Sequence, residues 1–207
     1  KKRFKSSPRL IIGPRGGVAN TIVYLSNIRR GKKPAATSLY NTRKLFIKQC
    51  EYQPHILLTP VGSYLAMHNL DRALHNIRMF GAATYNLPMP EPRTMFVKPL
   101  HQPGVISIRS DAGHGWMSAI IYVTPHPYFA LSDREGRFSL TDVPPGIYTI
   151  KAWHENWRVA RTIPKNRKPA FYEYEEPTIL FQKVTVPTSK SNERVKINVV
   201  FKFKAGV

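Results

Sequence analysis

The chain has 207 residues, of which 42% are apolar and 11% aromatic, so it folds around a core and is not a disordered tail. It carries 32 Lys and Arg against 12 Asp and Glu, and the net charge of +20 points to an acidic partner. The single cysteine excludes an internal disulfide and a structural zinc site built on several thiolates. No apolar run approaches the roughly 20 residues that cross a bilayer.

The positive charge is concentrated in the first part of the chain. Residues 1–48 contain 13 Lys or Arg and no acidic residue, and residues 1–126 carry +14 against +6 for residues 127–207. We predict a basic face that binds an acidic protein. No motif of a nucleic-acid-binding fold is present, so nucleic acid is not the expected partner. The predicted face consists of Arg15, Arg29, Arg30, Lys32, Lys33, Arg43, Lys44 and Lys48.

Short runs rich in β-branched and aromatic residues, bounded by Gly and Pro, predict an all-β fold. Helical periodicity is nearly absent, and residues 71–74 are expected to form a turn. Val195–Lys204 alternates between apolar and polar residues and predicts a half-buried strand. In chain order the expected strands are 10–12, 21–25, 45–50, 55–60, 64–69, 75–80, 94–100, 104–110, 118–124, 128–132, 137–140, 146–154, 180–186 and 195–204.

Proline-rich and turn-rich segments divide the chain. Pro125-His126-Pro127 predicts a short, stiff linker, because proline stops a strand from continuing. Residues 132–138 predict a tight turn closed by Gly136. We therefore expect a basic N-terminal extension at 1–8, one domain at 9–125 and a second at 126–207. The second domain carries an irregular surface insertion at about 160–178, where neither strand nor helix periodicity is seen.

Two histidines and a methionine form the strongest candidate for a metal site. His75 follows a polar turn at the start of a predicted strand, and Gly113-His114-Gly115-Trp116-Met117 lies in a loop between two strands. Two imidazoles and a thioether that converge from neighbouring loops suit copper, which accepts both ligand types. The predicted ligand set is His75, His114 and Met117.

This arrangement resembles the cupredoxins, whose first histidine ligand lies in an Asn-x-Asp-x-x-x-His-Asn setting like residues 69–76. The flanking segments 50–55, 86–90 and 126–130 are similar to a methylamine-utilisation or plastocyanin-like module. In that family a further segment usually precedes the module. Residues 133–140, 143–148 and 152–155 resemble the carboxypeptidase-regulatory-like (transthyretin-like) sandwich that follows that module. The resemblance implies two β-sandwiches, a cupredoxin-like Greek key followed by a smaller transthyretin-like sandwich.

One departure from the family alters the expected chemistry. Ser110 stands where the family has its copper thiolate, and a serine hydroxyl is a poor copper ligand. Cys50 precedes a different strand, and nothing in the sequence brings it to this loop. We therefore predict no blue-copper site and no cofactor; the alternative is a type 2-like copper site of His75, His114 and Met117.

The function expected from these features is that of a non-catalytic accessory or scaffold subunit, because no catalytic triad or carboxylate pair is present. The resemblance implies a periplasmic or extracellular location beside redox proteins, which makes a multihaem c-type cytochrome the expected acidic partner. Self-assembly through strand edges is a further expectation. The alternatives are a copper protein in electron transfer or copper handling, and a domain that binds a polyanion or carbohydrate.

Overall fold

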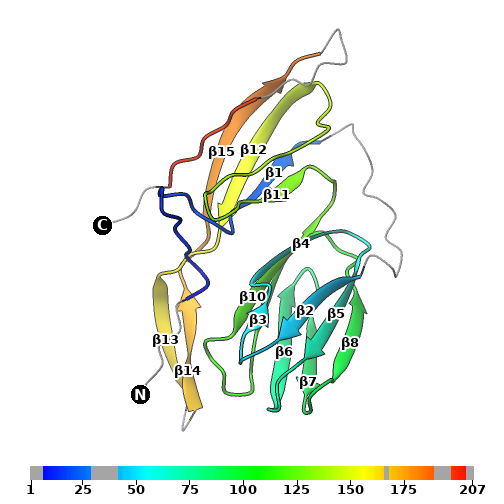
Figure 1. Ribbon diagram of the computed structural model, residues 1–207, viewed down its shortest axis with the longest axis vertical. Helices are drawn as coiled ribbons and strands as arrows, with labels where there is room; N and C mark the ends of the chain where they lie inside the picture. Colours follow the sequence, from blue (N-terminus) through cyan, green and yellow to red (C-terminus); the bar gives the residue numbers. More distant parts are fainter. Residues whose placement is uncertain (1–6, 29–41, 166–167, 189–196, 204–207) are drawn as a thin grey trace. The chain divides into compact units, whose positions relative to one another are not determined.

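The computed structural model describes residues 7–28, 42–165, 168–188 and 197–203. The predicted all-β fold is confirmed, since every regular element in these ranges is a strand (Figure 1). No helix in the described part of the chain is long and apolar enough to cross a membrane. The strands are β1 (Ile22–Ser26), β2 (Arg43–Ile47), β3 (Tyr52–Gln53), β4 (Ile56–Pro60), β5 (Tyr64–Asn69), β6 (His75–Gly81), β7 (Tyr85–Met89), β8 (Met95–Pro99), β9 (Gly104–Arg109), β10 (Ser118–Thr124), β11 (Phe129–Leu131), β12 (Gly146–His154), β13 (Val159–Lys165), β14 (Lys168–Tyr174) and β15 (Thr178–Val186).

The chain divides into two compact units, which we call the front unit and the rear unit. The front unit comprises residues 33–127 and 158–175, and the rear unit comprises residues 1–32, 128–157 and 176–207.

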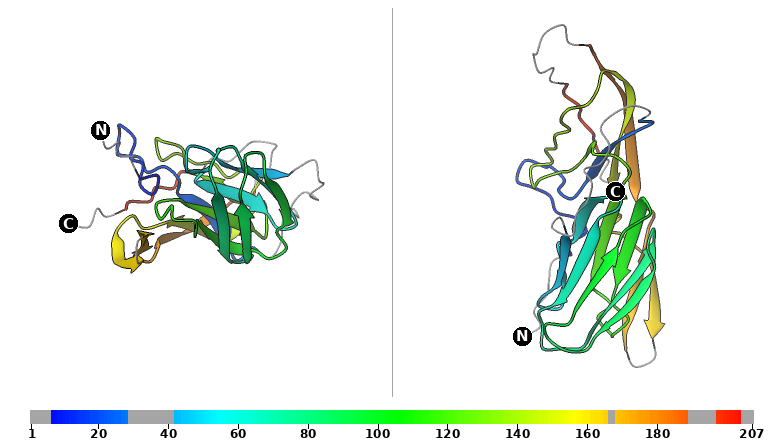
Figure 2. Two further views of the ribbon diagram at one scale, coloured as in Figure 1. Left: turned by 90° about the horizontal axis from the view of Figure 1, so that it is seen from below. Right: turned by 90° about the vertical axis from the view of Figure 1, so that its right-hand side faces the viewer.

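The front unit is a sandwich of two mixed sheets (Figures 1 and 2). One sheet has the order β3-β2-β5-β8, and its β2 and β5 are parallel. The other has the order β4-β10-β9-β6-β7, and its β4 and β10 are parallel. Each sheet thus joins strands that are distant in sequence.

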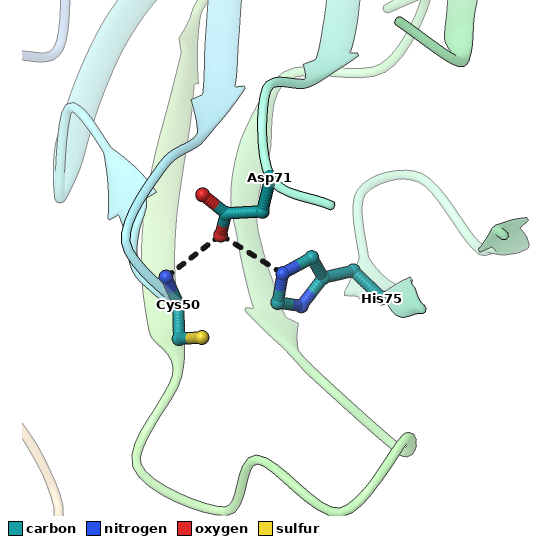
Figure 3. Close-up of side chains that lie close together, drawn as sticks. All are labelled: Cys50, Asp71 and His75. Atoms are coloured by element: carbon teal, nitrogen blue, oxygen red, sulfur yellow. Dashed lines mark hydrogen bonds and ion pairs between the residues drawn. The ribbon is translucent and has the colours of Figure 1, made fainter. Parts of the chain in front are cut away.

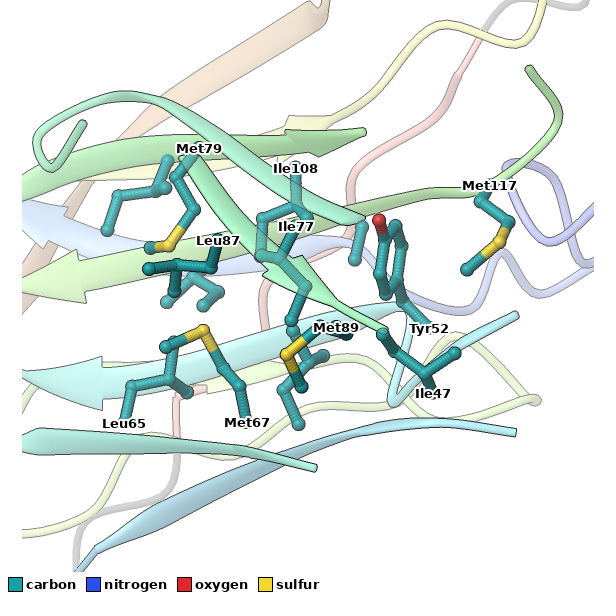
Figure 4. Packing of buried hydrophobic residues seen from close by; sticks show 14 of the residues in the cluster. Ile47, Tyr52, Leu65, Met67, Ile77, Met79, Leu87, Met89, Ile108 and Met117 are labelled. Carbon is teal, nitrogen blue, oxygen red and sulfur yellow. The ribbon is translucent and has the colours of Figure 1, made fainter. Parts of the chain in front are cut away.

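Alternating residues of both sheets point inward and form one core (Figure 4). Leu65 and Met67 of β5 face Ile77 and Met79 of β6, and all four are fully buried. This period of two, which the sequence shows directly, is what a two-layer β-structure requires.

The rear unit combines an early segment of the chain with two later ones, which corrects the predicted domain division. β1 lies between β11 and β12 in the four-stranded antiparallel sheet β11-β1-β12-β15. Residues 9–28 therefore belong with the rear unit and not with a domain at 9–125. The sequence could not reveal this, because β1 and β12 are more than 120 residues apart and pair only through the fold.

A glycine-rich turn confirms that this early segment packs on the rear unit. A Cβ at Gly13 would lie 2.0 Å from the carbonyl oxygen of Arg134, and one at Gly17 would lie 2.1 Å from the carbonyl oxygen of Glu135. The two segments approach so closely that a side chain cannot fit at either glycine. The predicted turn at 132–138 is present, and Gly136 adopts a φ of 71°.

A second layer without strand ladders covers the inner face of the rear sheet. Phe138, Leu140, Val199 and Phe201 pack against the core formed by β1 and β12. Residues 137–140 and the described residues 197–203 form no strand, so the strands expected at 137–140 and 195–204 are not found there. Val199 and Phe201 nevertheless face the core, as the alternation predicted. Residues 10–12 likewise form no strand beyond a bridge from Ile12 to Val18.

The segment at about 160–178, predicted to be an irregular insertion, forms regular strands. β13 and β14 form an antiparallel two-stranded hairpin with a shifted register at two places. Those irregularities explain why residues 160–178 showed no clean alternation. β7, an edge strand that contains Pro88, was also not predicted from the sequence.

Candidate metal centre

Two turns of the front unit leave the sandwich side by side. β2 and β5 run parallel and in register, with Ile47 opposite Asn69, so the turns at 48–51 and 70–74 lie at the same end. The amide of Leu70 donates to the carbonyl oxygen of Ile47 at 2.9 Å and joins the ends of the two strands. This register places Cys50, in the first turn, beside the polar residues of the second.

The same end also receives His75 and the loop that carries His114. β6 begins at His75, directly after the turn at 70–74, and its antiparallel neighbour β9 ends at Arg109 just before residues 110–117. Asn76 tightens the junction, because its side-chain oxygen accepts the amide of Asp111 at 3.1 Å. The turns at 48–51 and 70–74 and the loop at 110–117 therefore lie at the same end of the front unit.

The turn that carries Cys50 has an uncommon backbone. Lys48 and Glu51 exchange amide–carbonyl hydrogen bonds, and the two residues between them, Gln49 and Cys50, both have a φ of 55°. Two successive left-handed residues define a type I′ hairpin turn, which normally uses Asn and Gly. Here two residues with full side chains occupy it, so other contacts hold the turn in place.

Asp71 supplies those contacts. One carboxylate oxygen accepts the amide of Gln49 at 2.7 Å, and the other accepts the amide of Cys50 at 2.8 Å. Burial by itself would raise the pKa of Asp71, but these two amides and His75 together hold it below its ordinary value. The carboxylate is therefore ionised at neutral pH and acts as an acceptor.

Asn69 fixes the turn from which Asp71 projects. It is fully buried, and its side-chain amide donates to the carbonyl oxygens of Ala73, Met89 and Glu91 at 3.0–3.2 Å. Its side-chain oxygen accepts the amide of Asp71 at 3.0 Å. The sequence showed Asn69 as part of a motif but gave no indication of this role.

One ring nitrogen of His75 is hydrogen-bonded to Asp71, and the other has no hydrogen-bond partner among the described residues. Its Nε2 lies 2.9 Å from the second carboxylate oxygen, and because the ionised carboxylate can only accept, Nε2 carries the proton. Nδ1 is buried and has no hydrogen-bond partner among the described residues. A carboxylate that orients a histidine in this way is a common feature of metal sites.

His114 and Trp116 complete the group. The rings of His75 and His114 lie 4.8 Å apart between centroids, and Nδ1 of His114 is also buried without a partner in the described part of the chain. Burial lowers the pKa of His114, and His75 lowers it further against the opposing effect of Asp71, so the ring is neutral at pH 7. The indole of Trp116 packs edge-on against His114 and donates to the carbonyl oxygen of Cys50 at 3.0 Å.

These contacts create a compact set of donor atoms. The sulfur of Cys50, a carboxylate oxygen of Asp71 and a ring nitrogen of His75 all lie within 4.8 Å of one another. Figure 3 shows the Asp71 carboxylate between the backbone of Cys50 and the ring of His75, with the Cys50 sulfur directed toward His75. No sequence pattern indicated that Cys50 lies beside His75; the parallel register of β2 and β5 brings the two together.

The other predicted site residues have different surroundings. Met117 is 2% exposed in the front core, and its amide donates to the carbonyl oxygen of His114 (Figure 4). Ser110 is fully buried, and its hydroxyl accepts the amide of Ala112. Beside it, burial raises the pKa of Tyr52, whose hydroxyl donates to the carbonyl oxygen of Asn76.

The predicted basic face is described only in part. Arg43, Lys44 and Lys48 are exposed in the front unit. Arg15 belongs to the rear unit and pairs with Glu135 at 2.8 Å. The remaining members, Arg29, Arg30, Lys32 and Lys33, lie outside the described residues.

No protein-family model matches this sequence, and neither does any curated protein. Among solved structures the chain is similar to a purple cupredoxin from Nitrosopumilus maritimus, at 21% identity over 40% of this chain and 99% of that chain, with a TM-score of 0.35. An oxidised amicyanin mutant gives 17% identity over 49% of this chain and 98% of that one, with a TM-score of 0.37. A copper-containing nitrite reductase from Thermus scotoductus gives 17% identity and a TM-score of 0.36; 40% of this chain matches 22% of that enzyme. These similarities cover less than half of this chain, and no ligand or activity is transferred from them.

Proposed function

We propose that this protein binds one copper ion through the thiolate of Cys50 and the Nδ1 atoms of His75 and His114. The observation that carries this proposal is a pair of contacting histidine rings whose buried Nδ1 atoms have no hydrogen-bond partner among the described residues. One of the two, His75, has a ring nitrogen within 4.8 Å of the Cys50 sulfur. Buried polar atoms are almost always satisfied, so such a pair needs an explanation, and a bound cation supplies one.

The donor set favours copper over other metals. Two imidazoles with one thiolate, and a methionine as a weak fourth ligand, are the donors of electron-transfer copper sites. Met117, one of the three ligands predicted from the sequence, follows His114 by three residues; its side chain lies in the front core, and a place as the weak fourth ligand stays a prediction from the sequence. When bound, the ion would supply a one-electron couple whose potential depends on these ligands. The residues of the chain would hold it.

Asp71 is assigned an orienting role and not that of a ligand. Its two oxygens already accept three hydrogen bonds, from Gln49, Cys50 and His75. A zinc site built on Cys50, Asp71 and the two histidines would require it to release them. Zinc is therefore the less favoured metal and becomes one outcome of the test.

Metal titration of the metal-free protein tests the proposal. We expect one equivalent of copper, held more tightly than zinc, and a loss of affinity of about 100-fold or more in His75→Ala and His114→Ala, since even residues behind the ligands are worth 10–100-fold. His101→Ala is the matched control, because His101 is exposed and should leave binding unchanged. Zinc bound more tightly than copper, or equal affinities in all three variants, would contradict the proposal.

Copper binding should also quench the fluorescence of Trp116. The indole contacts both the ring of His114 and the backbone of Cys50, whereas Trp153 and Trp157 belong to the rear unit. We expect Trp116→Phe to remove most of the quenching while stoichiometric binding persists. Equal quenching in the wild type and in Trp116→Phe would show that copper binds elsewhere.

The docking of an accessory subunit onto an acidic protein, such as a multihaem cytochrome outside the cytoplasm, stays a prediction from the sequence. Arg43, Lys44 and Lys48 are the described residues that would serve it. That the protein is not an enzyme likewise stays a prediction from the sequence.

A further inference from the structure

The turn that carries Cys50 is held in a conformation that its own residues disfavour. Gln49 and Cys50 are both left-handed, which non-glycine residues with a Cβ adopt reluctantly. Neither residue is the Asn or Gly that usually fills such a turn. The conformation therefore depends on contacts from outside the turn.

Those contacts come from a single carboxylate that also holds His75. Asp71 accepts the amides of Gln49 and Cys50, and the oxygen that serves Cys50 also accepts Nε2 of His75 at 2.9 Å (Figure 3). The backbone of one proposed ligand and the ring of another are thus fixed by the same group. Because Asn69 in turn fixes Asp71, the arrangement is rigid before any metal binds.

We propose that Asp71 is the positioning residue that makes Cys50 available as a ligand. It does so by stabilising the left-handed turn at 49–50, and it does not itself contact the metal. This inference rests on the proposed copper site. It names the residue that determines whether the thiolate of Cys50 can bind the copper ion. Without Asp71, the turn would relax toward ordinary backbone angles, and the cysteine sulfur would move away from the ring of His75.

Asp71→Asn is the variant that separates these roles. The two turn amides bind different oxygens of Asp71. An asparagine side chain in the same position has an acceptor oxygen on one side and a donor nitrogen on the other, so it can accept only one of them. In the metal-free protein we expect the amides of Gln49 and Cys50 to exchange hydrogen about tenfold faster, the loss expected when a charge-assisted hydrogen bond is removed. In the copper-loaded protein we expect the visible thiolate-to-copper absorption per bound copper to fall by about half or more, while His75 and His114 retain the ion.

A second substitution provides the rescue. Gln49→Gly in the Asp71→Asn background makes one left-handed position favourable without restoring the carboxylate. We expect this double variant to recover much of the visible absorption, which a general loss of stability would not allow. Asp111→Asn is the matched control, because it removes a carboxylate from the neighbouring loop that contacts Arg109 and not the turn. If Asp71→Asn does not fold, Asp71→Glu, which displaces the carboxylate by one methylene, should show the same two effects in weaker form.

Amide exchange in the metal-free protein makes the two proposals separable. If wild-type protein with bound copper shows no thiolate absorption, the proposed copper site fails, whatever the exchange rates are. If that absorption is present but Asp71→Asn leaves both it and the two exchange rates unchanged, the role of Asp71 is overturned. A double variant with Gln49→Gly that recovers nothing would also overturn it.

Discussion

Replacing Cys50 with serine is expected to abolish the visible thiolate-to-copper absorption and to weaken copper binding by about 100-fold. A serine hydroxyl stays protonated near neutral pH and contributes little to a copper site. The substitution is nearly isosteric, and Cys50 is half-buried in a surface turn, so the fold should be preserved. Absorption spectra and competition with a chelator measure the two effects.

Thiol protection provides an independent check on Cys50. Because this is the only cysteine in the sequence, alkylation reports on one position. Stoichiometric copper should protect it from a reagent such as iodoacetamide, and His101→Ala should show the same protection. A thiol that reacts equally fast with and without copper would show that Cys50 is not a ligand.

A charge on β1 is expected to unfold the rear unit. Val23 is 1% exposed at the centre of β1, between Ala130 of β11 and Ala152 of β12. Val23→Asp buries a carboxylate in an apolar cluster, and we expect the free energy of unfolding to fall by more than about 4 kcal/mol. Denaturant unfolding followed by the fluorescence of Trp153 and Trp157 measures this loss.

The matched control for Val23→Asp lies on the same sheet. Ile147 of β12 is 74% exposed, and Ile147→Asp should change the free energy of unfolding by no more than about 1 kcal/mol. Copper binding by the front unit should survive both substitutions. If Val23→Asp destroys the copper site and leaves the rear tryptophans unaffected, β1 belongs to the front unit and the division described here is wrong.

The alternation of apolar residues was sufficient to predict most strands and the all-β class. In β6, for example, Ile77 and Met79 alternate with Asn76 and Arg78, and the two apolar residues form part of the core. This local signal could not show which strands pair. The membership of β1 in the rear sheet depends on pairing with β12 across most of the chain, so the boundary predicted at residue 9 was wrong.

The candidate metal site was likewise predictable only in part. His75 and His114 were found because each lies where a strand meets a polar loop, and the structure brings their rings together. Cys50 was missed because its position depends on the parallel register of β2 and β5, which leaves no periodic trace in the sequence. The left-handed turn was hidden for a similar reason, since Gln49 and Cys50 lack the Asn-Gly signature and depend on Asp71 instead.

X-ray absorption at the copper edge of the loaded protein tests the central claim most directly. The account predicts one sulfur neighbour at a thiolate distance together with two imidazoles, and the sulfur should disappear in Cys50→Ser while the imidazoles remain. A first shell of nitrogen and oxygen alone in the wild-type protein would contradict it.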